Sequence, residues 1–174
     1  MHIVNAEIDR DLIAIQGLLN EVIATSTALY DYNPRPLEQV RQWMLDKISG
    51  NLPIKVAIGK DGLFLGFATF GPFRPHPAYK YTVEHSIYVS SHARGKGIGK
   101  ALLQDIIAEA ELREKHLLVA AIDAQNSASL KLHESFGFTR AGILKESGFK
   151  FGRWLDLILM QKRLDTPLSP VDSC

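Results

Sequence analysis

Residues 94–100 read Arg94-Gly95-Lys96-Gly97-Ile98-Gly99-Lys100, and the fold of the chain is decided here. Three alternating glycines stand directly before a segment with the apolar period of a helix. Glycine permits a positive φ and lets the backbone come close to a ligand. Free N–H groups at a helix start, with the helix dipole behind them, bind anions. With the positive charges of Arg94, Lys96 and Lys100, the turn predicts a cradle for a pyrophosphate.

The spacing of this turn excludes two nucleotide-binding motifs. A Walker loop needs four residues between its glycines, whereas Gly95 and Gly99 enclose three, and Ala101 stands where a hydroxyl is required. The dinucleotide fingerprint is GxGxxG, whereas this segment is GxGxG in the middle of the chain. No aromatic residues interleave with the basic ones, so we expect no nucleic-acid partner. A solvated basic helix start remains the alternative on these residues alone.

Composition narrows the class of protein. With 174 residues, the chain has the length of one domain that folds unaided. A net charge of +1 gives no global field for nucleic acid or membrane, so any basic site is local. No apolar run approaches the roughly 18 residues of a membrane span, and the start of the chain lacks a signal-peptide pattern. We therefore expect a cytoplasmic protein without membrane contact.

Cysteine and histidine usage argues against two further kinds of site. The only cysteine is Cys174, so no intramolecular disulfide is expected, and a thiol catalyst at the chain end is not expected either. The six histidines show no metal-ligand spacing, and we expect no metal.

Hydrophobic periodicity predicts alternating elements along the chain. Helices are expected over 9–23, from 34–37 to 48, over 98–113 and over 126–136. Strands are expected over 54–58, 63–70, 82–89, 116–122 and 154–164, with 71–77 as a proline-rich loop. This order predicts an α/β fold with a mixed sheet and helices on both faces. The domain is expected to span 1–164, followed by a mobile tail over 165–174.

Two segments together resemble a known superfamily. Residues 94–99 match the R/Q-x-x-G-x-G/A turn of the GCN5-related N-acetyltransferases, and residues 126–138 match their N-x-x-[AS]-x-x-[LF]-Y-x-x-x-G-F segment. The resemblance implies that fold, a single domain, and acetyl-coenzyme A as co-substrate. It further implies cofactor-binding roles for a set of residues: Ile87, Tyr88, Val89, Arg94, Gly95, Lys96, Gly97, Ile98, Gly99, Lys100, Asn126 and Ser129.

Further pieces resemble one branch of that superfamily. Where most members have tyrosine, this chain has His133 in a Leu-His-Glu context, as in the phosphinothricin and methionine sulfoximine acetyltransferases. Residues 25–27, 71–74, 82–89 and 148–156 are also similar to that branch. The resemblance implies transfer of acetyl to the α-amino group of a small amino-acid analogue, and a homodimer.

Acetyl transfer to an amine requires a base that removes a proton from the ammonium group, and Glu84 is the candidate. It stands in an otherwise apolar, β-branched strand, where partial burial raises a carboxyl pKa. The alternative is an outward-facing acid on an alternating strand, and the resemblance favours the base. His85 is expected on the opposite side of the strand, in a structural role.

His133 is the second catalytic candidate. Helical spacing places it on one face with Asn126, Ser129 and Leu130. It is expected to protonate the leaving thiolate or to assist deprotonation of the amine, the alternative being an exposed histidine at a helix end.

Substrate contacts are expected from Phe73, Arg74 and Tyr30, besides Glu84. A guanidinium in a proline-rich loop suits a bidentate grip on a carboxylate or phosphinate. Tyr30 would supply an aromatic wall, where the branch usually has phenylalanine. Trp43 is expected in the core of the second helix, whereas Trp154 and Asp156 are expected either near the acceptor or closing the sheet.

Two other functions remain open at this stage. One is acetylation of a peptide N-terminus or another small amine, which requires an open groove. The other is a coenzyme A-binding module without catalysis.

Overall fold

A computed structural model describes residues 1–172; Cys174 and the end of the expected tail lie outside the described residues. Within this range the chain forms seven strands: β1 (His2–Asn5), β2 (Ile54–Ile58), β3 (Phe64–Pro72), β4 (Thr82–Val89), β5 (Leu117–Asp123), β6 (Thr139–Lys150) and β7 (Arg153–Arg163). The α-helices of this range are α1 (Ile8–Thr25), α2 (Leu37–Ser49), α3 (Ile98–Leu112) and α4 (Ser127–Ser135), and short 3₁₀ turns lie at Pro77–Tyr79 and Ser91–Ala93. The strand order is β1-β2-β3-β4-β5-β7-β6, and the β4–β5 pair is parallel. The predicted α/β fold with a mixed sheet is confirmed.

The contacts divide the chain into two compact units, each described in turn. The first holds Met1–Thr69 and Ser86–Ile106, and the second begins with Phe70–His85 and continues from Ile107. The strands β3 and β4 and the helix α3 each contribute residues to both units.

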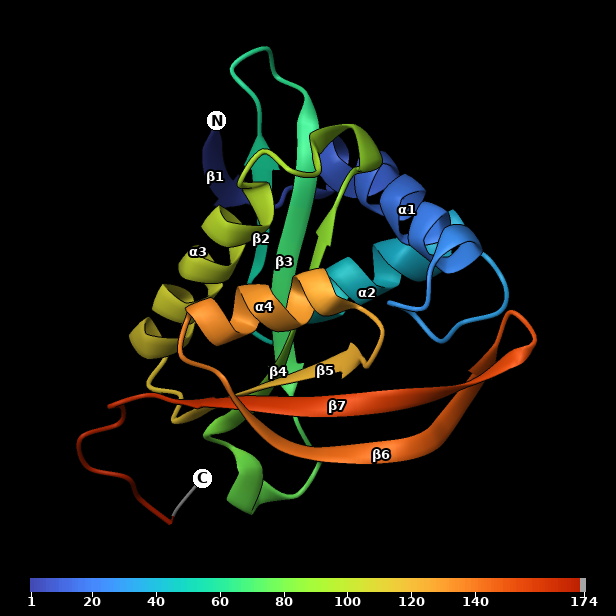
Figure 1. The fold of residues 1–174 in the computed structure, drawn as a ribbon. Helices are drawn as coiled ribbons and strands as arrows, with labels where there is room; N and C mark the ends of the chain where they lie inside the picture. The colour runs from blue at the N-terminus through green and yellow to red at the C-terminus, as the bar shows by residue number, and fades with distance from the viewer. Residues whose placement is uncertain (173–174) are drawn as a thin grey trace. The chain divides into compact units, whose positions relative to one another are not determined.

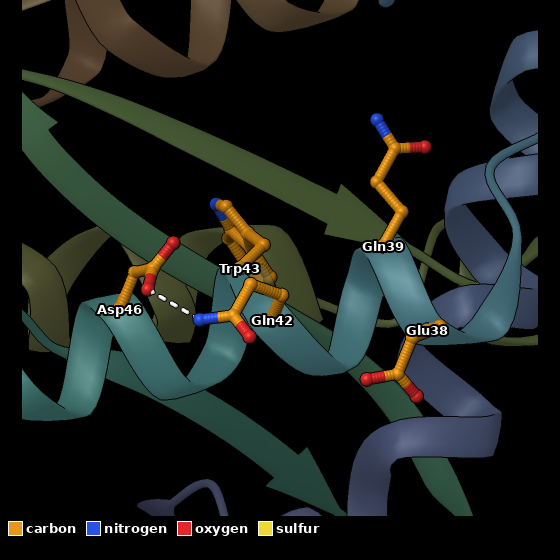
Figure 2. Close-up of a pocket in the computed structure, with 5 residues that line it drawn as sticks. All are labelled: Glu38, Gln39, Gln42, Trp43 and Asp46. Carbon is orange, nitrogen blue, oxygen red and sulfur yellow. Dashed lines mark hydrogen bonds between the residues drawn. The ribbon is translucent and has the colours of Figure 1, made fainter.

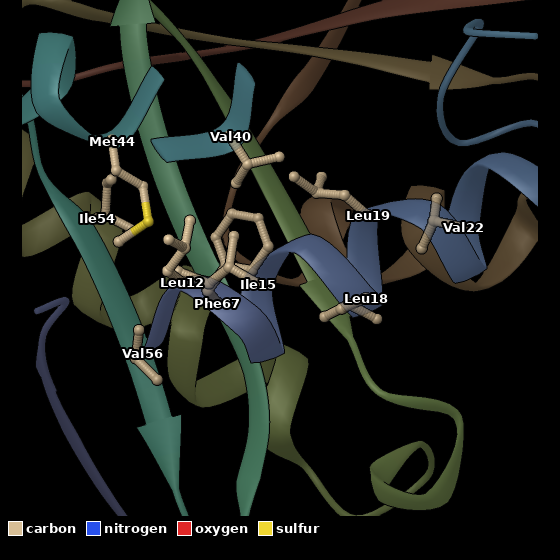
Figure 3. Packing of buried hydrophobic residues seen from close by; sticks show 10 residues of the cluster. All are labelled: Leu12, Ile15, Leu18, Leu19, Val22, Val40, Met44, Ile54, Val56 and Phe67. Atoms are coloured by element: carbon tan, nitrogen blue, oxygen red, sulfur yellow. The ribbon is translucent and has the colours of Figure 1, made fainter. Parts of the chain in front are cut away.

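The first unit has its core where two helices meet a sheet. Buried side chains of α1 recur at helical spacing, as Leu12, Ile15, Leu19 and Val22. Figure 3 shows them with Val40 and Met44 of α2 and with residues of β2 and β3, all in one apolar cluster. Full burial of one such side chain stabilises the fold by about 1.5–3 kcal/mol. The apolar period of the first predicted helix is therefore explained by this cluster.

Helix α2 matches its prediction except at one position. It begins directly after Pro36, and Trp43 packs against the cluster with its ring centroid 6.1 Å from that of Phe67. Ile48, expected on the same buried face, is 51% exposed instead. The last turn of α2 therefore contributes less to the core than its sequence pattern indicates.

A glycine permits the close approach of β3 to β4 in the first unit. A Cβ on Gly66 would lie 2.4 Å from the carbonyl oxygen of Tyr88, and the backbone there has a φ of +153°. Both facts exclude a side chain at this position. Nearby, the N–H of Ser90 donates to the carbonyl of Leu65, which continues the contact beyond the end of β4.

The second unit is built from β4, β5, β7 and β6 together with α4. Parallel pairing of β4 and β5 sets Glu84 opposite Val119. Strand β7 pairs antiparallel with β5 on one side. On its other side it pairs with β6, with which it forms a long hairpin (Figure 1). Phe151 and Gly152 close that hairpin with φ values of +50° and +74°, as a two-residue turn with positive φ requires.

Strands β1 and β6 were not predicted, and the loop predicted over 71–77 begins later than expected because β3 extends to Pro72. Strand β6 lies at the sheet edge with most side chains exposed, so no apolar alternation marks it. Strand β1 has four residues. Strand β3 runs through Pro72, which is compatible with a strand end, and the N–H of Phe73 still donates to the carbonyl of Thr82.

The segment after β7 is hydrogen-bonded to other parts of the second unit. The hydroxyl of Thr166 donates to the carbonyl of Lys115, and the N–H of Val171 donates to the Tyr81 hydroxyl at 3.1 Å. Hydrogen bonds therefore cross the predicted boundary at residue 164, and the mobility of the tail stays a prediction. No helix among residues 1–172 is long and apolar enough to cross a membrane.

Candidate functional site

The predicted site residues fall into both units. The first unit holds Tyr30, Ile87, Tyr88, Val89, Arg94, Gly95, Lys96, Gly97, Ile98, Gly99 and Lys100. The second unit holds Phe73, Arg74, Glu84, Asn126, Ser129 and His133.

The glycine turn has the backbone that an anion cradle needs. Gly95 and Gly97 have φ values of +73° and +80°, and open space surrounds the position of a Cβ at both. Their backbone conformation, and not crowding, therefore favours glycine. Residues 94–97 are exposed, while Ile98 anchors the start of α3 in the interior. The exposed turn thus stands at the positive end of a 15-residue helix, where an anion is favoured.

Two cations of this turn are held by neighbouring groups. The Arg94 Nε donates to the carbonyl of Val89 at 3.3 Å, and its guanidinium lies 3.9 Å from the Glu21 carboxylate. The Lys96 Nζ donates to the carbonyl of His92 at 2.9 Å. Both charges stay beside the turn, and both remain exposed to solvent.

The end of β4 and the loop after α1 complete the predicted residues of the first unit. Ile87, Tyr88 and Val89 are half-buried, and the Tyr88 ring packs on Phe67 with centroids 5.2 Å apart. This packing holds the strand directly before the glycine turn. Tyr30 is partly exposed in the loop between α1 and α2.

Glu84 is a half-buried carboxyl in the second unit. Burial raises its pKa above the ordinary value, and the positive charge of Arg74 opposes that shift. The predicted direction of the shift is confirmed. Arg74 itself is exposed, with its guanidinium 5.0 Å from the centre of the Phe73 ring. A half-buried carboxyl with a raised pKa therefore lies within electrostatic reach of the Arg74 cation.

His133 is buried, in contrast to the alternative of an exposed histidine at a helix end. It is 4% exposed, and its Nδ1 lies 2.7 Å from the carbonyl oxygen of Ser129. Its Nε2 lies 2.9 Å from the Nε2 of His85, which is also buried. The two rings stack, and Phe138 packs against both. Both ring nitrogens of His133 are thus engaged with groups of this unit.

The two catalytic candidates lie on opposite faces of the sheet in the second unit. Successive side chains of a strand point to opposite faces, so His85 and Glu84 of β4 diverge. His85 meets α4 through His133, and its predicted orientation away from Glu84 is therefore confirmed. His133 is brought together with His85, and not with Glu84.

Asn126 and Ser129 form a helix cap. The side-chain oxygen of Asn126 accepts a hydrogen bond from the N–H of Ser129 at 3.1 Å, which satisfies one free donor at the start of α4. Their cofactor-binding role stays a prediction.

Asp123 and the His85–His133 contact escaped prediction. Asp123 ends β5, is buried, and accepts a hydrogen bond from the N–H of Gln125 at 2.7 Å through one oxygen. The nearest cation to its other oxygen is Arg153 at 4.0 Å. The only sequence signal for Asp123 was the position of an acidic residue at the end of an apolar strand. The Asp156 carboxylate accepts from the N–H of Glu146 at 2.8 Å, and the alternatives for Trp154 and Asp156, near the acceptor or closing the sheet, stay predictions.

A surface hollow on α2 contains none of the predicted site residues. Figure 2 shows Glu38, Gln39, Gln42, Trp43 and Asp46 around it, with a hydrogen bond from Gln42 to Asp46. All five come from one helix. Among residues 1–172, no three side chains of the metal-ligating types gather into a possible cation site.

Known proteins resemble the chain over most of its length. The sequence profile of the Acetyltransferase (GNAT) family matches residues 18–138. An L-methionine sulfoximine/L-methionine sulfone acetyltransferase of Pseudomonas aeruginosa is 41% identical over 155 residues, which cover 89% of this chain and 90% of that protein. A phosphinothricin N-acetyltransferase of Alcaligenes faecalis is 40% identical over 158 residues, or 90% of this chain and 80% of that protein.

A solved structure shows the same fold with a bound ligand. The phosphinothricin acetyltransferase of Sinorhizobium meliloti, in complex with acetyl-coenzyme A, has a TM-score of 0.91 and 34% identity. The alignment covers 97% of this chain and 91% of that one. With the glycine turn at the start of α3 and matches of this extent, the chain belongs to the Acetyltransferase (GNAT) family and is an N-acetyltransferase of the phosphinothricin acetyltransferase-like branch.

Proposed function

We propose that the chain transfers the acetyl group of acetyl-coenzyme A to the α-amino group of a small amino-acid analogue. Phosphinothricin, methionine sulfoximine and methionine sulfone are the candidate acceptors, because relatives at about 40% identity carry these substrates in their names. The observation that carries the proposal is the half-burial of the Glu84 carboxyl on β4, with the positive charge of Arg74 close enough to influence its pKa. The acceptor has an ammonium that must lose a proton and a carboxylate that needs a cation, and these two groups match that need.

The residues of the glycine turn fit the pyrophosphate of coenzyme A. Residues 94–97 are exposed directly before a helix start, and Arg94, Lys96 and Lys100 add positive charge. The bound thioester supplies an acetyl group activated for attack by a neutral amine. In this proposal the backbone of residues 87–89 lines the pantetheine arm, and Asn126 and Ser129 contribute further contacts.

Glu84 is the proposed base. Only the neutral amine attacks, so the acceptor ammonium must first pass its proton to Glu84, directly or through a water molecule. Partial burial favours the protonated form of the carboxyl, which brings its pKa closer to the working pH and makes it a better acceptor.

Arg74, Phe73 and Tyr30 are the proposed substrate-binding residues. Arg74 grips the carboxylate or phosphinate of the acceptor through its planar fork of donors. Phe73 packs under that guanidinium and also meets Tyr79 edge-on, with centroids 5.7 Å apart. This stack limits the rotamers of Arg74 and orients its charge.

A homodimer is proposed for the assembled enzyme. The β6–β7 hairpin exposes an unusual number of large apolar side chains: Ile143, Leu144, Phe149, Phe151 and Trp154. Exposed apolar surface of this kind is typical of an interface. Sedimentation at micromolar concentration gives twice the mass of one chain if the proposal is correct, and the mass of one chain refutes it.

An assay of thiol release from acetyl-coenzyme A tests the function. The panel contains the three amino-acid analogues, free methionine, an N-terminal peptide and a lysine peptide. Turnover concentrated on the analogues supports the proposal. Turnover on peptides alone favours a peptide acetyltransferase, whereas tight coenzyme binding without turnover on any amine favours a non-catalytic module.

A further inference from the structure

We propose that His85 and His133 form a neutral positioning pair that joins β4 to α4, and that His133 therefore does not serve as the proton donor to the leaving thiolate. The proposal goes beyond the proposed function because it assigns a role to His85 and replaces the acid role expected for His133. The kinetic tests of this proposal assume that Glu84 is the base, whereas the tests that do not measure activity are independent of that assumption.

The contacts assign one proton to each ring. A carbonyl oxygen only accepts, so the Nδ1 of His133 must carry the proton that it shares with the Ser129 carbonyl at 2.7 Å. A neutral imidazole has one N–H, which leaves the Nε2 of His133 as an acceptor. The Nε2 of His85, 2.9 Å away, must then carry a proton and donate it. The two tautomers determine each other.

The surroundings keep both rings uncharged. Both are buried, and the Phe138 ring lies 5.4 Å from His85 and 5.1 Å from His133. A second proton on His133 would place two N–H groups against each other across 2.9 Å, and a second proton on His85 would add a charge to a buried ring. Of the charged groups on the packed elements, Lys131 and Glu134 of α4 are exposed, and Lys162 of β7 donates to the Phe136 carbonyl.

This arrangement connects the pair to Glu84 through one strand. His85 and Glu84 are neighbours on β4, and their side chains leave opposite faces. The contact of His85 with α4 therefore positions β4 from the face opposite Glu84. The position of β4 in turn sets the direction of the Glu84 carboxyl. His133 holds no spare proton for a thiolate, because its only N–H is bonded to Ser129.

Four variants separate positioning from acid catalysis. Gln has an amide nitrogen where histidine has Nε2, so His85→Gln keeps a donor toward His133, whereas His85→Leu removes it. His133→Gln keeps an acceptor toward His85 but has no acidic proton, and His133→Leu has neither. We expect the Gln variants to stay within about 5-fold of the parent kcat, and the Leu variants to fall by more than about 10-fold. A general acid typically contributes about 10²-fold or more.

The pH profile adds a readout that simple destabilisation would not move. The acid limb of kcat/KM, which reports Glu84, should shift in His85→Leu and return toward the parent position in His85→Gln. A loss of about 10²-fold in His133→Gln with an unchanged melting temperature would overturn the proposal. An unshifted acid limb in His85→Leu would overturn it equally.

Nitrogen-15 NMR of the imidazoles tests the pair without any assay of activity. The expected spectrum has protonated Nδ1 on His133, protonated Nε2 on His85, and no titration of either ring between pH 8 and 5. The reverse tautomers, or a ring that titrates near pH 6.5, would refute the pair. Because this result does not involve the substrate, it stays distinct from a failure of the proposed function.

Discussion

The Nε2 atoms of His85 and His133 face each other at 2.9 Å beneath helix α4. Burial, and secondarily the proximity of His133, lowers the pKa of His85 from 6.5 to about 3. The pKa of His133 is also lowered by burial. A histidine that protonates less readily in the folded state couples folding to pH.

The sign of this coupling gives the first prediction. Since the unfolded chain takes up the proton near pH 6.5, the contribution of His85 to stability is complete above that pH. It is lost as pH falls toward about 3. Urea unfolding between pH 8 and 5 should show stability falling below pH 6.5 by up to about 1.4 kcal/mol per pH unit for each such proton. His85→Leu should show a shallower fall, and an equal slope in both proteins would contradict the assignment.

Replacement of Glu84 should remove most of the activity. We expect Glu84→Ala to lower kcat by about 10²-fold or more, because the amine then loses its base. In the parent enzyme, activity should fall with decreasing pH through the raised pKa of Glu84, since only the carboxylate accepts a proton. Steady-state kinetics across pH 5–9 provide the measurement. Coenzyme affinity should be unchanged, and full activity of the variant at neutral pH would exclude Glu84 as the base.

Loss of the guanidinium at position 74 should affect one substrate only. Arg74→Ala is expected to raise the KM for the amino-acid analogue by about 10-fold or more, because a charge-assisted pair contributes about 1.5–3 kcal/mol. The KM for acetyl-coenzyme A should not change. Arg140→Ala is the matched control, since Arg140 is an exposed arginine of the same unit paired with Glu134. Equal effects of the two substitutions would argue against a substrate contact at Arg74.

A methyl group at Gly97 should fit in the space available, but the positive φ of this residue disfavours any side chain. Gly97→Ala is expected to cost about 1 kcal/mol of stability, because its φ of +80° disfavours a side chain. It should also raise the KM for acetyl-coenzyme A several-fold. Gly17→Ala serves as the control: Gly17 lies in α1 with open space around it, and alanine there should stabilise by up to about 1 kcal/mol. Unchanged coenzyme kinetics in Gly97→Ala would remove the turn from the cofactor site.

Local chemistry explains which elements were predictable. The bounds of β2 and β4 agree with prediction, because short apolar or alternating runs end at turn residues such as Gly59. The glycine turn was predictable because glycine adopts the positive φ found at Gly95 and Gly97 at little steric cost. Strand β6 escaped because an edge strand with both faces largely exposed has no apolar period.

The site divides in the same way. Sequence alone determined the helix start at Ile98, the glycine cradle before it, the strand position of Glu84 and the helical face shared by Ser129 and His133, because each depends on residues close together in the chain. Only the tertiary structure decided that His133 meets His85, 48 residues earlier, and therefore lies on the face of the sheet opposite Glu84. Burial and the position of one carbonyl oxygen assign the protons of that pair, and neither is encoded in the spacing of residues along the chain.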